Sequence, residues 1–282
     1  PRSRVYSMLC RTANIPSFDV QFGLLGNESV EWQYLISDYV LVWGEKAKNY
    51  MLNLGVPINK IIITGSPRHD FKYSQSKNLV DNKKKELKIS SNKSIFVLAS
   101  TFNDKHHSRY VNPDILNSMK EAIFNSVLRC PDIVLIIKPH PFENINETKN
   151  YIKELPNKII YADSKSDVRE LIHLSDAFLS FGSTTAIDAL IADKVVISPI
   201  FPGWVFSEYI NEISHFQPKS ESEIYQIFKS FNGKFFTSKP YLSNSSIKSS
   251  LKKLIYKYDI SNKHSTKSST RRISKIIMNH IK

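Results

Sequence analysis

The feature that most constrains the fold is a regular alternation of short apolar runs with amphipathic segments in the middle of the chain. The apolar runs have the length and the β-branched composition of buried strands, and they lie at residues 94–100, 133–137, 158–161, 177–180 and 195–198. The segments between them have helical periodicity, and Asn112-Pro113-Asp114 supplies an N-cap and a proline at the first helical position. Strands that alternate with short helices predict an α/β fold, a parallel sheet with helices on both faces.

The same alternation extends toward the N-terminus, but it is shorter there. A buried strand is expected at residues 38–43, a helix at 45–54 that stops at Gly55, and a β-branched strand at 60–64. The expected domains are a partial N-terminal Rossmann-like domain at 1–71, a linker at 72–93, a C-terminal Rossmann-like domain at 94–240 and basic helices at 241–282.

The positive charge of the chain is concentrated at its C-terminal end. The formal net charge is +13, and residues 244–282 hold ten Lys or Arg against one acidic residue, Asp259. A basic tail of this kind can dock on an anionic membrane surface, or it can form helices that pack on the core with a solvated charged face. Because no aromatic and basic platform accompanies these charges, we do not expect binding to nucleic acid.

Cysteine usage and hydropathy point to a soluble protein of a reducing compartment. Cys10 and Cys130 form neither a disulfide framework nor a metal-binding spacing, and no apolar run reaches the ~20 residues that a membrane span needs. We therefore expect a cytoplasmic location, with peripheral contact with the inner face of the plasma membrane as an option.

Two motifs follow strands of the predicted C-terminal sheet, and the first is Lys138-Pro139-His140-Pro141. The carboxyl ends of strands in an open α/β sheet are where ligands bind. The two prolines restrict the backbone around His140 and hold its imidazole in place. A fixed imidazole beside an ammonium group can donate to phosphate oxygens or protonate a leaving phosphate, although a histidine in a turn can also be purely structural.

The second motif is Gly182-Ser183-Thr184-Thr185, which leads from a strand into a helix. Its glycine permits a sharp turn and a close backbone approach, and the hydroxyls add donors to the free N–H groups of the helix start. Taken alone, it can equally be an ordinary Ser/Thr cap. Two such sites on one edge of a sheet predict a ligand that carries phosphate.

Together, the motifs resemble the C-terminal nucleotide-binding half of a GT-B glycosyltransferase. More narrowly, they are similar to the bacterial surface- and capsule-polysaccharide group, which includes sialyl- and polysialyltransferases, capsule-type Kdo transferases and CDP-glycerol glycerophosphotransferases. His140-Pro141 matches the His-Pro motif of that group, and Ser183-Thr184-Thr185 matches its Ser-Ser/Thr motif. The resemblance spans about residues 20–205.

The resemblance implies two Rossmann-type domains with parallel sheets, of which the N-terminal one is incomplete here. It also implies that His140 and the hydroxyls hold the donor phosphate. From its charge and position, we expect Lys138 to help neutralise that phosphate. The nucleotide sugar is then a co-substrate, and neither a separate cofactor nor a metal is expected, since protein cations neutralise the leaving phosphate.

The upstream loop Gln21-Phe22-Gly23 resembles a Gln-His-Gly loop of the same group, with Phe22 in place of the histidine. The role of that histidine is therefore vacant or moved in this chain. Glu28 and Glu31 lie just beyond and are candidates for the catalytic base, Glu28 first, although loop carboxylates are usually only solvated.

Weaker candidates surround these motifs. Asp104, His107 and Arg109 follow the first strand of the C-terminal domain and, with Gln21, are candidates for contact with the acceptor or the cleft, a polar surface loop being the alternative. Glu143 is a candidate for the ribose or the base of the donor, or it caps the next helix. Trp204 either walls the base pocket or packs at the interface between the domains.

The function expected from these residues is that of a metal-independent GT-B glycosyltransferase. It would move a sugar, or a polyol phosphate, from a nucleotide-activated donor to a surface or capsular glycan of a bacterium. Two alternatives stay open at this point. One is an enzyme like the nucleotide-sugar 2-epimerases, which share the fold, and the other is a non-catalytic GT-B-like binding protein.

Overall fold

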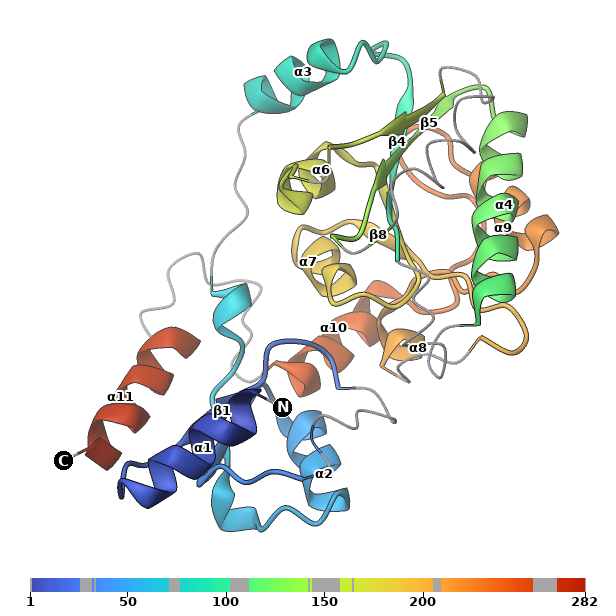
Figure 1. Ribbon diagram of the computed structural model, residues 1–282. Coiled ribbons are helices and arrows are strands. Elements are labelled where there is room, and N and C mark those ends of the chain that lie inside the picture. Colours follow the sequence, from blue (N-terminus) through green and yellow to red (C-terminus); the bar gives the residue numbers. More distant parts are fainter. Residues whose placement is uncertain are drawn as a thin grey trace. The chain divides into compact units, whose positions relative to one another are not determined.

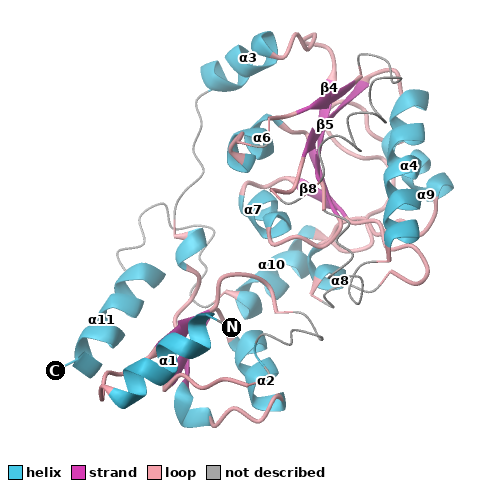
Figure 2. Cartoon of the chain, in the orientation of Figure 1, coloured by secondary structure: helices cyan, strands magenta, loops and turns pink. Residues whose placement is uncertain are grey.

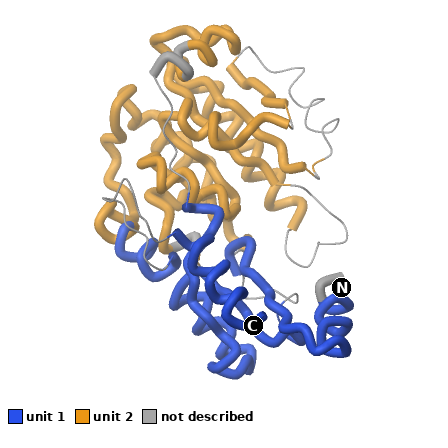
Figure 3. Tube along the Cα trace, turned by 90° about the vertical axis from the view of Figure 1, so that its left-hand side faces the viewer, with its two compact units in different colours: residues 1–72, 248–282 blue, residues 73–247 orange. Residues whose placement is uncertain are grey.

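The computed structural model describes residues 2–25, 32, 34–70, 77–101, 112–141, 143, 158–163, 165–204, 209–255 and 268–281. The chain forms two compact units, which Figure 3 distinguishes by colour. One unit consists of residues 1–72 and 248–282, and the other consists of residues 73–247. We call them the split unit and the central unit.

The central unit is built on a five-stranded sheet in the order β6-β5-β4-β7-β8. The strands are β4 (Ser94–Ala99), β5 (Ile133–Lys138), β6 (Ile159–Tyr161), β7 (Ala177–Ser180) and β8 (Val195–Ile197). Every neighbouring pair is parallel. All residues of β4, β5 and β7 are buried, as their continuous apolar sequence predicts for strands covered on both faces.

Helices cover both faces of this sheet, as Figure 1 shows. Helices α4 (Pro113–Arg129) and α9 (Glu221–Lys229) lie on one face, and α6 (Val168–Leu174) and α7 (Thr185–Ile191) lie on the other. The Asn112 side chain caps α4 by accepting from the backbone N–H groups of Asp114 and Ile115. The α/β architecture expected for this region is therefore confirmed.

The main core of the central unit lies between the sheet and the helices α4 and α9. Phe96 in β4 is fully buried, and its ring makes edge contacts with Phe228 at 5.1 Å and Phe231 at 5.4 Å between centroids. Burial of aromatic rings contributes both apolar area and specific edge-to-face geometry. The core therefore holds the strand ends of this sheet in fixed positions.

The split unit contains a parallel three-stranded sheet in the order β1-β2-β3. The strands are β1 (Phe18–Val20), β2 (Tyr39–Val42) and β3 (Ile61–Ile63). The helices of this unit include α1 (Arg2–Thr12), α2 (Glu45–Asn53) and α11 (Ser269–Ile281), and the 3-10 helices Ile58–Lys60 and Pro67–His69 (Figure 2). Residues 248–254, the second part of the helix Asn244–Leu254, also belong to it.

The two sequence segments of the split unit are joined by a helix cap. The carboxylate of Asp70 accepts from the backbone N–H groups of Ser269 and Thr270 at 2.7 Å each, at the first turn of α11. Arg272 in the same helix donates through Nε to the Thr64 carbonyl at 2.7 Å. A carboxylate at a helix N-terminus satisfies unpaired N–H groups and complements the helix dipole. Asp70 therefore fixes α11 on a segment that lies far from it in sequence.

Three further helices complete the described structure. Helix α3 (Lys77–Glu86) lies within residues 72–93, the expected linker, and α8 (Ile210–Ile213) follows β8. Helix α10 (Asn244–Leu254) and α11 lie where basic helices are expected. The helix expected near residues 147–155 lies outside the described residues. Among the described helices, none is both long and apolar enough to span a membrane, and Cys10 and Cys130 are both free thiols.

A buried histidine links β8 to the start of α10 and gives the fold a pH dependence. The Val196 N–H donates to Nδ1 of His215 at 3.0 Å, so Nδ1 carries no proton, and Nε2 bonds Oδ1 of Asn244 at 2.7 Å. Burial lowers the pKa of His215, although the bond to Asn244 opposes this. The neutral ring is therefore favoured in the folded state. Its contribution to stability is complete above the unfolded pKa of about 6.5 and is lost as the pH falls through the lower folded value.

We expect His215→Gln, which keeps polar groups but does not titrate, to flatten the loss of stability on acidification. Urea unfolding of both proteins between pH 7.5 and pH 5 measures this. The free energy of unfolding of the parent protein should fall more steeply below about pH 6.5 than that of the variant. Parallel pH profiles would mean that other groups carry the acid sensitivity.

Candidate functional site

Strand register brings the two sequence motifs to one edge of the central sheet. Strand β4 lies between β5 and β7. Lys138, the last residue of β5, and Ser180, the last residue of β7, are both paired in register with Ala99, the last residue of β4. The chain segments that follow these three strands therefore leave the same carboxyl edge of the sheet.

This edge also contains the point where the strand order reverses. From β4 the chain proceeds to β5 and β6 on one side, and it then crosses to β7 and β8 on the other side. The segments after β4 and β7 consequently diverge from adjacent strands. In open α/β sheets, a crevice at such a reversal is the usual ligand site.

The His-Pro segment places two cationic or potentially cationic groups at this edge. Lys138 is buried, and its ammonium group donates to the Pro139 carbonyl at 3.1 Å. Burial lowers the pKa of Lys138, while Asp163, Glu143 and Asp167 raise it. A desolvated cation acts on a phosphate through a lower effective dielectric than a solvated one does.

His140 is half-buried in the same segment. Burial is the largest influence on its pKa and lowers it; Glu143 raises the pKa, and Lys138 lowers it further. A lowered pKa makes the imidazolium a stronger acid, so that it transfers its proton more readily to a leaving oxygen. The segment can therefore both bind a phosphate and supply a proton to it.

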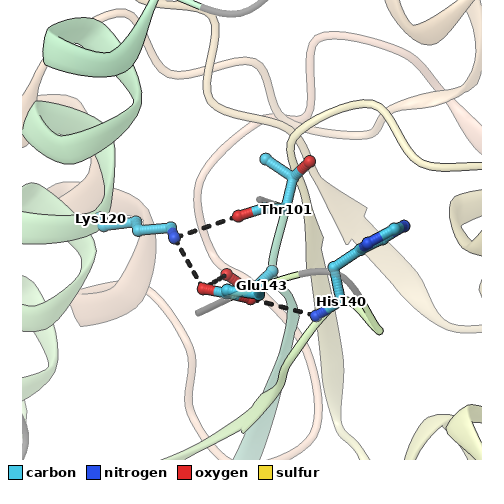
Figure 4. Close-up of polar contacts among 5 residues, drawn as sticks. Thr101, Lys120, His140 and Glu143 are labelled. Carbon is cyan, nitrogen blue, oxygen red and sulfur yellow. Dashed lines mark hydrogen bonds and ion pairs between the residues drawn. The ribbon is translucent and has the colours of Figure 1, made fainter. Parts of the chain in front are cut away.

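The carboxylate of Glu143 holds this segment in place (Figure 4). Oε2 accepts from the His140 backbone N–H at 3.0 Å, while the Glu143 N–H donates to the His140 carbonyl at 2.9 Å. Oε1 accepts from Lys120 Nζ at 2.9 Å and from Ser100 Oγ at 2.9 Å. The Glu143 side chain therefore makes three hydrogen bonds within the protein, and its expected contact with the ribose or base stays a prediction.

The hydroxyl motif is shaped by a serine that precedes it. Oγ of Ser180 accepts from the backbone N–H groups of Gly182 at 3.2 Å and Ser183 at 2.9 Å, and Gly182 has a φ of 111°. A φ this far beyond the left-handed helical region is strained for a residue with a Cβ, which favours glycine at this turn. Ser180 and Gly182 together direct the chain into α7.

The three hydroxyls of this motif have different environments. Oγ of Ser183 accepts from the Thr185 N–H at 3.3 Å, and Thr184 is the N-cap of α7 without a capping bond from its side chain. Oγ1 of Thr185 is buried and has no hydrogen-bond partner among the residues that the structure describes. Since buried polar atoms are nearly always satisfied, this hydroxyl is suited to bind a ligand atom.

Trp204 belongs to the hydrophobic core beneath the site. Its side chain is buried, and its ring lies 6.3 Å from that of Phe181 in an edge-on arrangement. Phe181 is the residue between Ser180 and Gly182. Trp204 therefore packs against a residue of the turn that carries the hydroxyl motif.

On the acceptor side, Gln21 is committed to internal bonds in the split unit. Its Oε1 accepts from the Trp43 N–H at 2.8 Å and its Nε2 donates to the Gly23 carbonyl at 2.8 Å. Phe22, in the place of the expected histidine, is 72% exposed. Gln21 thus positions the loop that follows β1, and Phe22 points into solvent.

Five of the predicted site residues lie outside the part of the chain that the structure describes: Glu28, Glu31, Asp104, His107 and Arg109. Their proposed roles therefore stay predictions. Within the described part of the chain, no three His, Cys, Asp or Glu side chains are grouped as they would be around a metal ion.

Sequence reasoning missed Lys120, although a signal for it exists. Lys120 occupies position i+4 from Leu116 and precedes Ile123 by three residues, so that it lies on the apolar stripe of α4. A lysine on a buried helix face needs an acidic partner. Its partner, Glu143, follows β5 in the sequence, and the spacing of the two residues does not predict that they form a pair. Ser100 and Ser180 carry no signal of their own in the sequence.

The comparisons with known proteins agree with this geometry. The family model described as CDP-Glycerol:Poly(glycerophosphate) glycerophosphotransferase matches residues 25–201, more than half of the chain. No curated protein sequence gives a significant match.

Three solved structures that are similar to this chain are remote from it in sequence. Anabaena HepE in complex with UDP-glucose has a TM-score of 0.59 at 13% identity, over 98% of this chain and 75% of its own. UDP-GlcNAc 2-epimerase from Neisseria meningitidis, bound to UDP-GlcNAc, has a TM-score of 0.58 at 15% identity, over 97% and 72%. The wall teichoic acid polymerase TagF has a TM-score of 0.54 at 15% identity, over 87% and 58%.

These likenesses confirm the GT-B-like fold. Transferases and an epimerase are both among them, so the fold by itself does not distinguish the two activities. The family match is what separates them.

Proposed function

This chain belongs to the CDP-glycerol:poly(glycerophosphate) glycerophosphotransferase family, and we propose that its central unit binds the diphosphate of a nucleotide-activated donor at the carboxyl edge of β4, β5 and β7. The chain is a transferase that uses a nucleotide donor. Its acceptor, in this proposal, is a growing surface polymer, and the transferred group is a sugar or a polyol phosphate.

The observation that carries the proposal is the register of Lys138 and Ser180 with Ala99. It gives a diphosphate two kinds of partner along one sheet edge. Lys138 and His140 follow β5 and supply positive charge, whereas Gly182 and the hydroxyls follow β7 and supply hydrogen-bond donors. Charge-assisted hydrogen bonds of this kind are about twice as strong as neutral ones.

Each candidate residue has a proposed role in the transfer. His140 and Lys138 neutralise the donor phosphate, and His140 gives its proton to the departing nucleotide as the bond to the transferred group breaks. Ser183, Thr184 and Thr185 bind the phosphate, and the buried Thr185 hydroxyl gains the partner that it lacks among the described residues. Glu28 accepts the proton of the attacking acceptor hydroxyl. No metal takes part in this scheme.

Calorimetric titration of the whole chain with CDP-glycerol and with CMP-, CDP-, UDP- and GDP-sugars tests donor binding. We expect saturable binding to at least one of them, with cytidine diphosphate donors bound tightest on the basis of the family match. Lack of saturation with every donor would refute the proposal. Product analysis without an acceptor separates the alternatives, because conversion of a free UDP-sugar into its epimer would indicate the 2-epimerase reaction.

We also propose a peripheral contact between the basic C-terminal helices and an anionic membrane. Helices α10 and α11 contain no acidic residue, and Met278 and Ile281 of α11 are more than half exposed beside Arg271 and Lys275. Each Lys or Arg near anionic headgroups contributes about 1 kcal/mol.

Cosedimentation with vesicles of phosphatidylserine and phosphatidylcholine measures this contact. We expect Arg271→Glu with Lys275→Glu to reduce the bound fraction severalfold at 0.1 M salt. The control Lys219→Glu with Lys234→Glu changes the net charge equally on two exposed lysines of the central unit. If both pairs reduce binding alike, the contact is not specific to α11.

A further inference from the structure

The ion pair of Lys120 and Glu143 ties together three segments that surround His140. Lys120 extends from α4, Ser100 and Thr101 follow β4, and His140 follows β5. Lys120 donates to Oε1 of Glu143 at 2.9 Å and to the Thr101 carbonyl at 3.2 Å. The single carboxylate therefore connects helix, strand end and His-Pro segment, as Figure 4 shows.

Both charges of this pair are removed from water. The side chain of Glu143 is 4% exposed, and that of Lys120 is 14% exposed. A buried ion pair is weak as a source of stability, because desolvation offsets most of the attraction between the charges. Here, however, the carboxylate also accepts from the His140 N–H and from the Ser100 hydroxyl. Apolar side chains of the same size would fill the space but could not make these bonds.

We propose that Lys120 and Glu143 are positioning residues of the transfer reaction: they fix the backbone at His140 without touching the donor. The proposal deepens the proposed function and rests on it, since it assigns the task of orienting the donor-phosphate histidine. In Figure 4 the His140 ring points away from the Glu143 carboxylate, while its backbone N–H points toward it. The carboxylate thus holds the main chain and leaves the ring directed elsewhere.

The two lysines near the site, Lys120 and Lys138, have different environments. Lys120 forms an ion pair with Glu143, which neutralises its positive charge within the protein. Lys138 lies at the carboxyl end of β5, where its ammonium group donates to the Pro139 carbonyl at 3.1 Å. The charge offered to a donor phosphate therefore comes from Lys138 and His140.

Glu143 also influences the pKa of His140, on which burial has the largest effect. The charged groups that act on the ring are Glu143, which raises its pKa, and Lys138, which lowers it, in addition to burial. Glu143→Gln removes the raising influence, so the pKa of His140 falls further. Since the proposed role requires the imidazolium, the alkaline limb of the pH–rate profile must move to lower pH in this variant.

Histidine titration by NMR in the ligand-free protein tests this link without reference to activity. The chain has eight histidines, and the spectrum of His140→Ala identifies the resonance of His140. We expect Glu143→Gln to shift the titration midpoint of that resonance to lower pH and to leave the others in place. The exposed pair Lys93–Asp132 provides the control, because Lys93→Met removes a lysine from an ion pair that lies at the surface.

Kinetics supplies the second readout. Misplacement of a reacting group by about 1 Å costs on the order of 100-fold in rate, so we expect Glu143→Gln and Lys120→Met each to lower kcat by roughly 10- to 100-fold. The donor KM should change less, and Lys120→Arg should restore part of kcat. The double variant should be no worse than the poorer single variant, since both residues act through one linkage.

The outcomes separate the two proposals. A lower melting temperature with an unchanged His140 titration and an unchanged kcat would reduce the pair to structural packing and overturn its positioning role. A parent protein that binds no donor would instead refute the proposed function, whatever the titration shows. A shifted titration together with a kcat loss that exceeds the change in KM supports the positioning role.

Discussion

His140→Ala is expected to lower kcat/KM for transfer by at least tenfold, and by about 100-fold if the imidazole acts as a general acid. The variant removes a cationic donor to the phosphate and the proton for the leaving nucleotide. Steady-state kinetics with the donor found by calorimetry measures the effect. His140 lies at the end of the buried strand β5, and its backbone bonds to Glu143 do not involve the ring. The fold should therefore tolerate the change.

The comparison variant His140→Gln separates binding from acid catalysis. Glutamine can still donate a hydrogen bond to a phosphate oxygen, but it cannot give up a proton at neutral pH. If His140 acts as an acid, His140→Gln should restore donor affinity and leave kcat low. Unchanged kinetics in His140→Ala would remove His140 from the site altogether.

The pH dependence of the parent enzyme follows from the same residue. Burial and Lys138 lower the pKa of His140 below its ordinary value, although Glu143 opposes them. The fraction of imidazolium therefore falls with rising pH at a lower pH than for a solvated histidine. Transfer should accordingly decline as the pH rises through this lowered pKa, and the decline should be missing from the residual activity of His140→Gln.

Gly44→Ala is expected to destabilise the protein by about 3 kcal/mol, the second large effect. Gly44 is the N-cap of α2 and has extended backbone angles, φ −166° and ψ −173°, which any residue can adopt. A Cβ at this position would lie 2.5 Å from the Leu254 carbonyl oxygen and 2.6 Å from that of Lys253. These are backbone atoms of α10 and cannot rotate away, so α10 or α2 must move.

The control is Gly55→Ala, where a Cβ would meet nothing within 4 Å but the backbone has a φ of 80°. That substitution costs only the left-handed strain of about 1 kcal/mol. Urea unfolding gives both free energies, and hydrogen exchange should show faster exchange at the end of α10 in Gly44→Ala alone. Equal losses of stability would mean that the contact with α10 is not tight.

The sequence predicts the central sheet well because its strands are buried on both faces. A short, continuous apolar run such as residues 133–137 is typical of a strand that is buried on both faces. Short elements with mixed patterns escape detection. The strand Phe18–Val20 has three residues, and helix α3, Lys77–Glu86, is so rich in lysine that no apolar stripe marks it.

The site is predictable only in part, because its parts come together through register. Sequence spacing indicates that Lys138 and Ser180 each end a strand. Lys138 and Ser180 both pair with Ala99 because β4 lies between β5 and β7. The alternation of strands and helices in the sequence does not determine this strand order. Glu143 shows a second limit of prediction from sequence. Its residue type is compatible with contact to a ligand, but the sequence does not indicate that its carboxylate accepts hydrogen bonds from Ser100 and Lys120.

The cap that Asp70 provides for α11 has a consequence for biosynthesis. The split unit needs residues 248–282 to dock on residues 1–72, whereas the central unit is continuous in sequence. On the ribosome, which adds about 5–20 residues per second, the central unit is complete before α11 emerges. Residues 1–72 therefore complete their packing only after α11 has left the exit tunnel.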